Sequence, residues 1–253
     1  MLARLYLAIT FLTRIPAGSI GKIQPAELAR TALFFPVVGW LIGGLFCAIA
    51  WLGSMTGLTA GIVAILLVAF GAWLTRGLHL DGWADLLDGL GGGYVPEKRL
   101  LIMKDSSLGV FGGVGLVLLL LLKVSCLSSI LAQPAEMKYL LLAGAPVTAR
   151  WAMVLLAFRS KYPRLAGTGH PFVGKIAGSD LLLGVIMVLP VLAAGLPGLT
   201  VVLASLVPAV WLRIQCRQAL GGITGDVLGA GCELGEAAGW LATVFWLSGN
   251  LIL

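Results

Sequence analysis

Three aspartates in the stretch His79–Gly89 give the clearest chemical signal in this chain. Asp81, Asp85 and Asp88 stand at positions i, i+4 and i+7, which places their side chains on one face of a helix. Like charges on one stripe repel one another, and a bound cation makes the arrangement favourable. Mg²⁺ takes carboxylate oxygens and keeps substrate phosphates and waters as its remaining ligands. Apolar neighbours such as Trp83 argue against a solvated acidic face. The spacing therefore predicts a magnesium site.

The segment Met103–Gly109 follows the aspartate stripe and carries further polar groups. Asp105 is a candidate fourth metal ligand, and Lys104 is a candidate phosphate contact. Ser106 has two interpretations, since its hydroxyl suits either a substrate contact or a cap for the apolar helix that follows.

A glycine-rich stretch near the C-terminus, Gly221–Glu236, holds two more acids. Its first residues read Gly-Gly-Ile-Thr-Gly, and such loops offer backbone N–H groups to an anion. Thr224 lies in that loop, and Asp226 and Glu233 follow it seven residues apart. We expect Thr224 and Glu233 to contact substrate and Asp226 to act as a base.

Histidine and basic side chains complete the set of candidate residues. His79 suits a general base or a phosphate contact, with a hydrogen-bonded interfacial histidine as the alternative. Arg150 and Lys123 lie inside apolar stretches, where a charge costs at least about 2.5–3.5 kcal/mol and must face the interior with a partner. For Arg150 a phosphate contact and a structural salt bridge both remain open. Arg76 and Lys175 are further candidate phosphate contacts.

The elements that must position these residues are membrane helices. The chain has 253 residues, of which 59% are hydrophobic and 11% charged, whereas soluble domains carry about 25% charged residues. Apolar stretches near the roughly 20 residues that a membrane crossing needs predict an all-α integral membrane protein of one domain (1–253), with a short N-terminal interfacial or re-entrant helix at Leu2–Thr13. The seven predicted spans are Thr31–Trp51, Leu58–Leu78, Gly109–Leu131, Tyr139–Phe158, Leu181–Leu196, Leu199–Leu212 and Ala237–Leu253.

The basic residues predict the orientation of these spans. Fourteen of the seventeen Lys and Arg residues fall before the first span or after the second, fourth and sixth, while the alternate loops hold only Lys138. The positive-inside rule then places the N-terminus in the cytoplasm. The net charge of +6 is explained by these loops and by contact with anionic membrane lipid. No groove-reading helix is present, so we expect no nucleic-acid partner. Whether copies associate into a homo-oligomer stays open.

Four stretches of the chain, taken together, match one known family: Phe11–Pro16, Gly77–Gly89, Met103–Gly109 and Gly221–Glu236. At these residues the sequence closely resembles the cobalamin synthases, the adenosylcobinamide-GDP ribazoletransferases of cobalamin biosynthesis. The stretches run from the first helix to the last, so the resemblance covers nearly the whole chain.

The resemblance implies an enzyme with Mg²⁺ as cofactor, in the bacterial cytoplasmic (inner) membrane. Adenosylcobinamide-GDP would react with α-ribazole, or its 5′-phosphate, to give adenosylcobalamin, or its 5′-phosphate, with release of GMP. A ribose hydroxyl would attack the phosphorus carried by the cobinamide side. The roles implied are metal ligands (Asp81, Asp85, Asp88, Asp105), phosphate contacts (Arg76, Lys104, Arg150, Lys175) and a base (His79 or Asp226).

Two other classes of protein fit parts of the pattern. A secondary transporter also has several spans with buried charge, but it more often shows mid-membrane broken helices and internal symmetry. A CDP-alcohol phosphatidyltransferase uses a similar aspartate cluster with Mg²⁺. This chain lacks that family's trailing Gly-x₃-Asp-x₃-Asp pattern, because Asp88 is followed by Gly-Leu-Gly-Gly.

Overall fold

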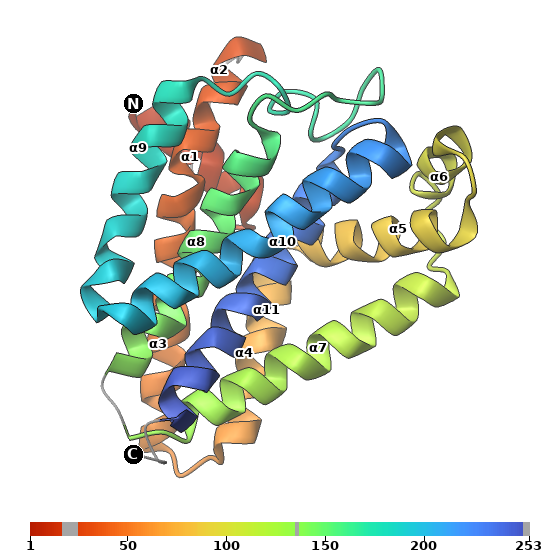
Figure 1. The fold of residues 1–253 in the computed structure, drawn as a ribbon. Coiled ribbons are helices and arrows are strands. Elements are labelled where there is room, and N and C mark those ends of the chain that lie inside the picture. The colour runs from red at the N-terminus through yellow and green to blue at the C-terminus, as the bar shows by residue number, and fades with distance from the viewer. Residues whose placement is uncertain (17–24, 135–136, 250–253) are drawn as a thin grey trace.

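A computed structural model describes residues 1–16, 25–134 and 137–249 of the chain (Figure 1). The described residues form helices and no strand, which confirms the all-α prediction. The α-helices are α1 (Leu2–Leu12), α2 (Pro25–Thr31), α3 (Phe35–Met55), α4 (Ala60–Leu74), α5 (Leu78–Gly92), α6 (Pro96–Ile102), α7 (Val110–Leu131), α8 (Met137–Ala157), α9 (Gly178–Val188), α10 (Leu196–Leu220) and α11 (Gly225–Gly249). Two short 3-10 helices, η1 (Ala32–Phe34) and η2 (Leu189–Ala194), precede α3 and follow α9.

Several of these helices are long and apolar enough to cross a membrane. Within the described residues, four qualify: Glu27–Met55, which includes α3, together with α7, α8 and α10. The pair α4 and α5 is bent by 88° and makes a fifth only if it is counted as one broken span. The prediction of a multi-pass membrane protein is therefore supported, whereas the count of seven spans stays a prediction. The last residues of the seventh predicted span, 250–253, lie outside the described part.

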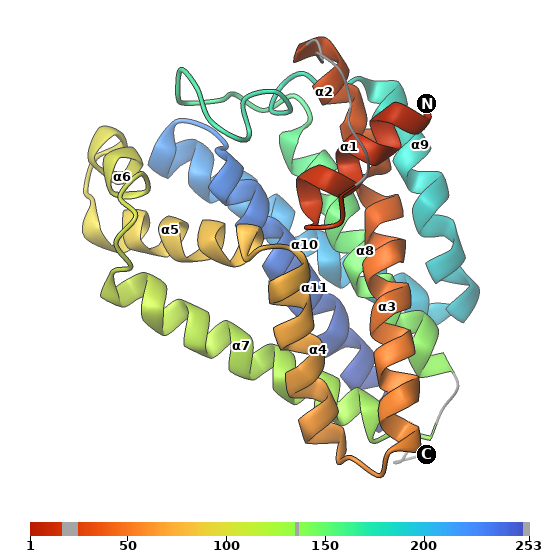
Figure 2. The same cartoon turned by 180° about the vertical axis from the view of Figure 1, so that it is seen from behind.

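The second predicted span ends earlier than expected. Its helix, α4, stops at Leu74, because Arg76 (φ 57°) and Gly77 (φ 67°) adopt left-handed backbone conformations. Two such residues in a row cannot continue a right-handed helix. The chain turns almost at right angles there, and α5 runs across the bundle instead of along it, as Figure 2 shows. We therefore treat α5 as a helix outside the spanning segments.

The last two helices also differ from the expected spans. Helix α10 extends to Leu220 and so includes Arg213 and Arg217, which were assigned to a loop. Helix α11 begins at Gly225, twelve residues before the predicted start at Ala237. Hydropathy missed its first half because the acids of that half lower the local average, although they are part of the helix.

Helix α8 forms the centre of the bundle, packed against α3, α10 and α11 (Figure 1). Its contact with α3 depends on the Gly-x₃-Gly pattern of α3: an added Cβ would lie 2.6 Å from the Val147 Cα at Gly39 and 2.7 Å from the Ala143 Cα at Gly43. Small residues let membrane helices approach this closely. A hydroxyl–hydroxyl bond of 2.8 Å from Thr148 to Ser205 joins α8 to α10.

The N-terminal helix α1 confirms the predicted short N-terminal helix. It packs on the bundle through Leu12 and through Phe11, whose ring lies 5.1 Å from that of Phe172 and 6.1 Å from that of Phe35. Its end is tied to the turn between α4 and α5, where the Arg14 amide bonds the Leu74 carbonyl at 2.7 Å. This packing places α1 beside the start of α5, the helix that carries Asp81, Asp85 and Asp88.

Candidate active site

The aspartate stripe lies on α5, as the spacing predicted. Asp81 and Asp85 line an open cleft of about 610 Å³, whose other walls come from α1, from the α4–α5 turn and from residues 106–108. Asp81 is exposed and Asp85 is half-buried. Phe11 and Leu116 make part of the wall apolar, while Arg76, Ser106 and Ser107 make part of it polar. The cleft therefore combines carboxylates, one guanidinium and an apolar face.

Negative charge accumulates around Asp85. Burial and the neighbouring charges of Asp81 and Asp226 raise the pKa of Asp85 to about 7. Asp226 comes this close because Gly82 lets α11 approach: a Cβ at Gly82 would lie 2.7 Å from the Asp226 carbonyl oxygen. Neither Asp81 nor Asp85 has an ion-pair partner in the described part of the chain. A cation at this point would relieve the repulsion.

Asp88 has another role from the one predicted. Its two carboxylate oxygens accept hydrogen bonds from the backbone N–H groups of Gly109 and Gly112, each at 2.8 Å. These N–H groups belong to the first turn of α7, which has no partner for them within the helix. Asp88 therefore caps α7 from α5, so Ser106, which the sequence offered as that cap, is free to line the cleft.

The four predicted metal ligands are not brought together as a set. Among the described residues, no group of three or more His, Cys, Asp or Glu side chains is placed to hold a metal ion. Asp105 is exposed and accepts a bond from the Ser107 amide at 2.9 Å. Asp81 and Asp85 alone fit Mg²⁺, which is usually bound through one or two carboxylates and substrate phosphates. These two carboxylates would therefore suit a Mg²⁺ ion only if substrate phosphates completed its ligands.

The predicted base Asp226 is paired with an arginine that sequence reasoning missed. Its Oδ2 accepts bonds from Arg164 Nη1 at 2.9 Å and from the Thr224 hydroxyl at 3.2 Å. Burial raises the pKa of Asp226, and Arg164 acts in the opposite direction. Arg164 Nε and Nη2 are buried and have no hydrogen-bond partner among the described residues. Its only signal in the sequence was its place in a basic loop.

Thr224 and the glycine loop serve the start of α11. The Thr224 hydroxyl accepts a bond from the Val227 amide at 3.3 Å, as a helix cap does. The Gly222 and Ile223 amides bond the carbonyls of Cys216 and Lys161. The Gly222 and Ile223 amides are therefore used within the protein, so any contact of this loop with an anion would have to come from its other N–H groups.

His79 lies away from the cleft. It is 1% exposed, and it lines a small separate cavity together with apolar residues such as Phe35, Phe172 and Leu228. Burial, followed by the charge of Arg150, lowers the pKa of His79 to about 3. Within the described part of the chain, neither ring nitrogen has a hydrogen-bond partner. The imidazole is therefore neutral and a weak base, so its geometry does not favour the predicted role as general base.

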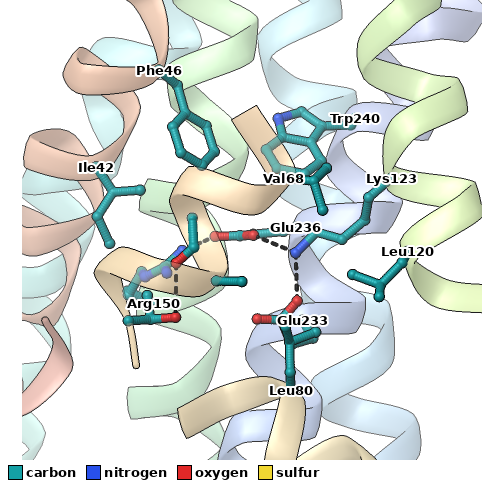
Figure 3. Close-up of a pocket in the computed structure, with 13 residues that line it drawn as sticks. Ile42, Phe46, Val68, Leu80, Leu120, Lys123, Arg150, Glu233, Glu236 and Trp240 are labelled. Atoms are coloured by element: carbon teal, nitrogen blue, oxygen red, sulfur yellow. Dashed lines mark hydrogen bonds and ion pairs between the residues drawn. The ribbon is translucent and has the colours of Figure 1, made fainter. Parts of the chain in front are cut away.

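The two remaining charges inside predicted spans, Lys123 and Arg150, belong to a buried ion network, shown in Figure 3. Lys123 on α7 bonds both Glu233 and Glu236 on α11, the second at 2.9 Å, and Arg150 on α8 bonds Glu236. All four side chains are at most 8% exposed. Two positive and two negative charges thus compensate one another around a cavity of about 20 Å³, beside the ring of Trp240.

The predicted phosphate contacts Arg150 and Glu233 are therefore engaged inside the bundle, where the alternative of a structural salt bridge holds for Arg150. Glu236 was not singled out from the sequence, although it accepts from both cations.

The other predicted phosphate contacts are dispersed. Arg76 lines the cleft, but its Nη2 also donates to the carbonyls of Thr10 and Thr13, each at 2.6 Å, and so holds α1 in place. Lys104 is exposed beside the cleft segment. Lys175 is exposed on the segment between α8 and α9, where its Nζ lies 3.4 Å from His170 Nδ1. Only Arg76 and Ser106 of the predicted contacts share the cleft with Asp81 and Asp85.

Comparison with known proteins agrees with the motifs. A family model described as cobalamin-5-phosphate synthase matches residues 4–244. A relative from Syntrophobacter fumaroxidans, named adenosylcobinamide-GDP ribazoletransferase, is 44% identical over 90% of this chain and 93% of its own. One of the same name from Chlorobaculum tepidum is 39% identical over 98% of both chains. No solved structure matches. The chain belongs to the cobalamin-5-phosphate synthase family.

Proposed function

We propose that this protein is a Mg²⁺-dependent adenosylcobinamide-GDP ribazoletransferase of the bacterial cytoplasmic membrane. The observation that carries the proposal is the cleft, in which the unpaired carboxylates of Asp81 and Asp85 face open space beside Arg76. The names of the relatives supply the substrates. The same motifs and this family match favour the transferase over a transporter or a CDP-alcohol phosphatidyltransferase.

The reaction joins α-ribazole, or its 5′-phosphate, to the cobinamide phosphate. The ribose hydroxyl attacks the phosphorus next to cobinamide, the bond from that phosphorus to the bridging oxygen breaks, and GMP leaves with that oxygen. Mg²⁺ held by Asp81 and Asp85 would neutralise the diphosphate and the leaving phosphate. Arg76 contributes a positive charge to the same cleft. Asp226, whose charge acts on Asp85, is the candidate acceptor of the hydroxyl proton.

The apolar part of the cleft suits a substrate with a large organic body. Phe11, Leu108 and Leu116 contribute to the wall opposite the polar groups. A diphosphate can thus meet the carboxylates while the corrinoid or the base of α-ribazole contacts the apolar surface. An apolar wall also excludes water from the phosphorus, which favours transfer to the ribose hydroxyl over hydrolysis.

We propose seven crossings with the N-terminus in the cytoplasm. The arrangement supports this, because α2, α6 and the segment between α8 and α9 lie toward one end of the bundle, and the α3–α4 turn lies at the other (Figures 1 and 2). The first group of segments carries seven of the seventeen Lys and Arg residues, and the α3–α4 turn carries none. The cleft then opens toward the cytoplasm, where GMP is released.

The experiment that tests the function measures GMP release by purified protein in detergent. With Mg²⁺, adenosylcobinamide-GDP and α-ribazole we expect GMP, and we expect no release of CMP when CDP-diacylglycerol replaces the cobinamide substrate. Chelation of Mg²⁺ should stop turnover and its return should restore it. Asp85→Asn should lower turnover about 10²–10³-fold, as loss of a main electrostatic stabiliser does. Glu97→Gln, on exposed α6, is the matched control. Equal activity in both variants would refute the metal assignment.

A further inference from the structure

Outside the cleft, a second hollow is lined by basic side chains from two distant parts of the sequence. It measures about 210 Å³, and its charged lining residues are Arg159, Lys161, Arg213 and Arg217. Ser160 and the turn Gly221–Ile223 complete the walls, and no acidic residue lines it. None of the four basic side chains has an ion pair with a carboxylate in the described residues. We call this hollow the basic pocket.

The walls of the basic pocket are fixed by contacts within the protein. Arg213 donates through Nη2 to the Phe158 carbonyl and, at 3.2 Å, to the Ser160 hydroxyl oxygen. The Ile223 amide bonds the Lys161 carbonyl at 2.9 Å. Segments 159–161 and 213–223 are therefore held against each other, so their positive charges converge on one hollow even when it is empty of ligand.

Arg159 is an unusual choice for its position. It directly follows the last turn of α8 with φ at +53°, in the left-handed region where glycine or asparagine usually ends a helix. The backbone therefore gives no reason for an arginine there. Its guanidinium lies 5.2 Å from the centre of the Phe158 ring and borders the basic pocket. The side chain explains why an arginine occupies this position, because its guanidinium adds a positive charge to the basic pocket.

The location of the basic pocket indicates where its ligand comes from. It lies at the ends of α8 and α10, which are both long and apolar enough to cross a membrane. Such helix ends stand at the level of the lipid headgroups. The volume is below the roughly 300–1,000 Å³ of a pocket for a drug-sized ligand. It suits one phosphate group with its ester substituent better than a whole nucleotide.

We propose that the basic pocket binds the phosphate group of a phosphodiester or phosphomonoester at the membrane boundary. Guanidinium groups match phosphate geometry through paired hydrogen bonds, and several converging cations give such a site its affinity. The phosphate belongs either to an anionic lipid headgroup or to a soluble ester. The pocket shares no lining residue with the cleft, so the inference does not depend on the proposed reaction.

The test compares two variants that remove the same amount of charge. Arg159→Gln/Arg217→Gln strips the pocket and keeps Arg213, which holds the wall. Arg30→Gln/Lys98→Gln removes two exposed charges from α2 and α6 and is the control. Thermal unfolding in detergent is followed with inorganic phosphate against chloride at equal ionic strength. In parallel, retained lipid is counted by native mass spectrometry after reconstitution with phosphatidylglycerol or phosphatidylcholine.

We expect a phosphate ligand to stabilise the wild type and the control pair. Its affinity for the pocket variant should be about tenfold lower or more, because each lost charge-assisted hydrogen bond contributes at least that factor. Arg159→Lys/Arg217→Lys, which keeps the charge, should retain part of the effect and shows that folding is intact. Selective retention of phosphatidylglycerol supports a lipid headgroup, and stabilisation by inorganic phosphate alone supports a soluble ester. If the pocket and control variants respond alike in both arms, the proposal is overturned.

Discussion

Neutralising Glu236 should destabilise the protein more than other single acid substitutions. The Glu236 carboxylate lies between Lys123 and Arg150, and all three side chains are at most 8% exposed. Glu236→Gln keeps the shape of the side chain and leaves the network with one unbalanced positive charge. Breaking a buried ion pair costs about 3–5 kcal/mol, because the remaining charge has lost its compensation far from water. At about 2–4 °C per kcal/mol for a chain of this size, Tm should fall by about 6–20 °C.

A second substitution separates charge balance from simple loss of packing. Lys123→Met in the Glu236→Gln background restores a net charge of zero, with Arg150 facing Glu233, whose charges already interact. If the two substitutions acted independently, their losses of stability would add and Tm would fall further. We expect instead that Tm of the double variant lies above that of Glu236→Gln alone. Tm is measured in detergent by tryptophan fluorescence, with Glu97→Gln as the exposed control. A further fall in the double variant would refute the network as the cause.

The same variants test whether the network contacts substrate. Because the network lies inside the bundle, the turnover of folded Glu236→Gln, assayed well below its Tm, should stay within about twofold of wild type, a change below 0.5 kcal/mol in the barrier. A loss of several hundredfold in a folded sample would return Arg150 and Glu233 to the role of phosphate contacts.

Three further predictions address the capping contact, the missed arginine and the orientation. Asp88→Ala removes both bonds to the start of α7 and should cost about 1–2 kcal/mol, measured as a lower Tm; an unchanged Tm would contradict the cap. Arg164→Lys keeps the positive charge beside Asp226 but loses the planar guanidinium. We expect kcat/KM for GMP release to fall at least tenfold while Tm stays close to that of the wild type. Normal kinetics would limit the role of Arg164 to its ion pair with Asp226. In a variant without native cysteines, a cysteine at Ser54, which is exposed at the end of α3, should react with an impermeant thiol reagent added outside the cell, and one at Pro96 should not; the reverse result would overturn the orientation.

The lengths of the apolar stretches predicted where most helices lie, but they did not predict the turn between α4 and α5 that creates the cleft. Hydropathy carries the second predicted span smoothly to Leu78, because Trp73 and Leu74 continue the apolar run. What ends the helix is a backbone feature, the left-handed conformation of Arg76 and Gly77. A single glycine in a chain with 35 of them is a weak signal. The right angle between α4 and α5, which presents Asp81 to the cleft, therefore required the structure.

The spacing of the acidic residues correctly predicted which of them share a helix. It did not predict which groups on other helices bind their carboxylates. Asp81, Asp85 and Asp88 do lie on one helix, yet α7 takes both oxygens of Asp88. Glu233 shares a helix with Asp226, seven residues away, yet Lys123 takes its carboxylate. Partners come from helices distant in sequence, and helical periodicity holds no information about them. Only the rule that a buried membrane charge needs a partner pointed toward the network, without naming Glu236.

What distinguishes Asp81 and Asp85 from Asp226, Glu233 and Glu236 is that they have no ion-pair partner in the described residues and that they line an open cleft. Glu233 and Glu236 are balanced by Lys123 and Arg150, and Asp226 is balanced by Arg164. Asp81 and Asp85 face the cleft with no ion-pair partner in the described chain. Folding two carboxylates together without a counter-charge lowers stability, and a fold keeps such an arrangement only where a ligand supplies the missing charge. In the proposed reaction, Mg²⁺ bound with the substrate diphosphate would supply that charge, so that the stability withheld from the free protein would become affinity for the metal–substrate complex.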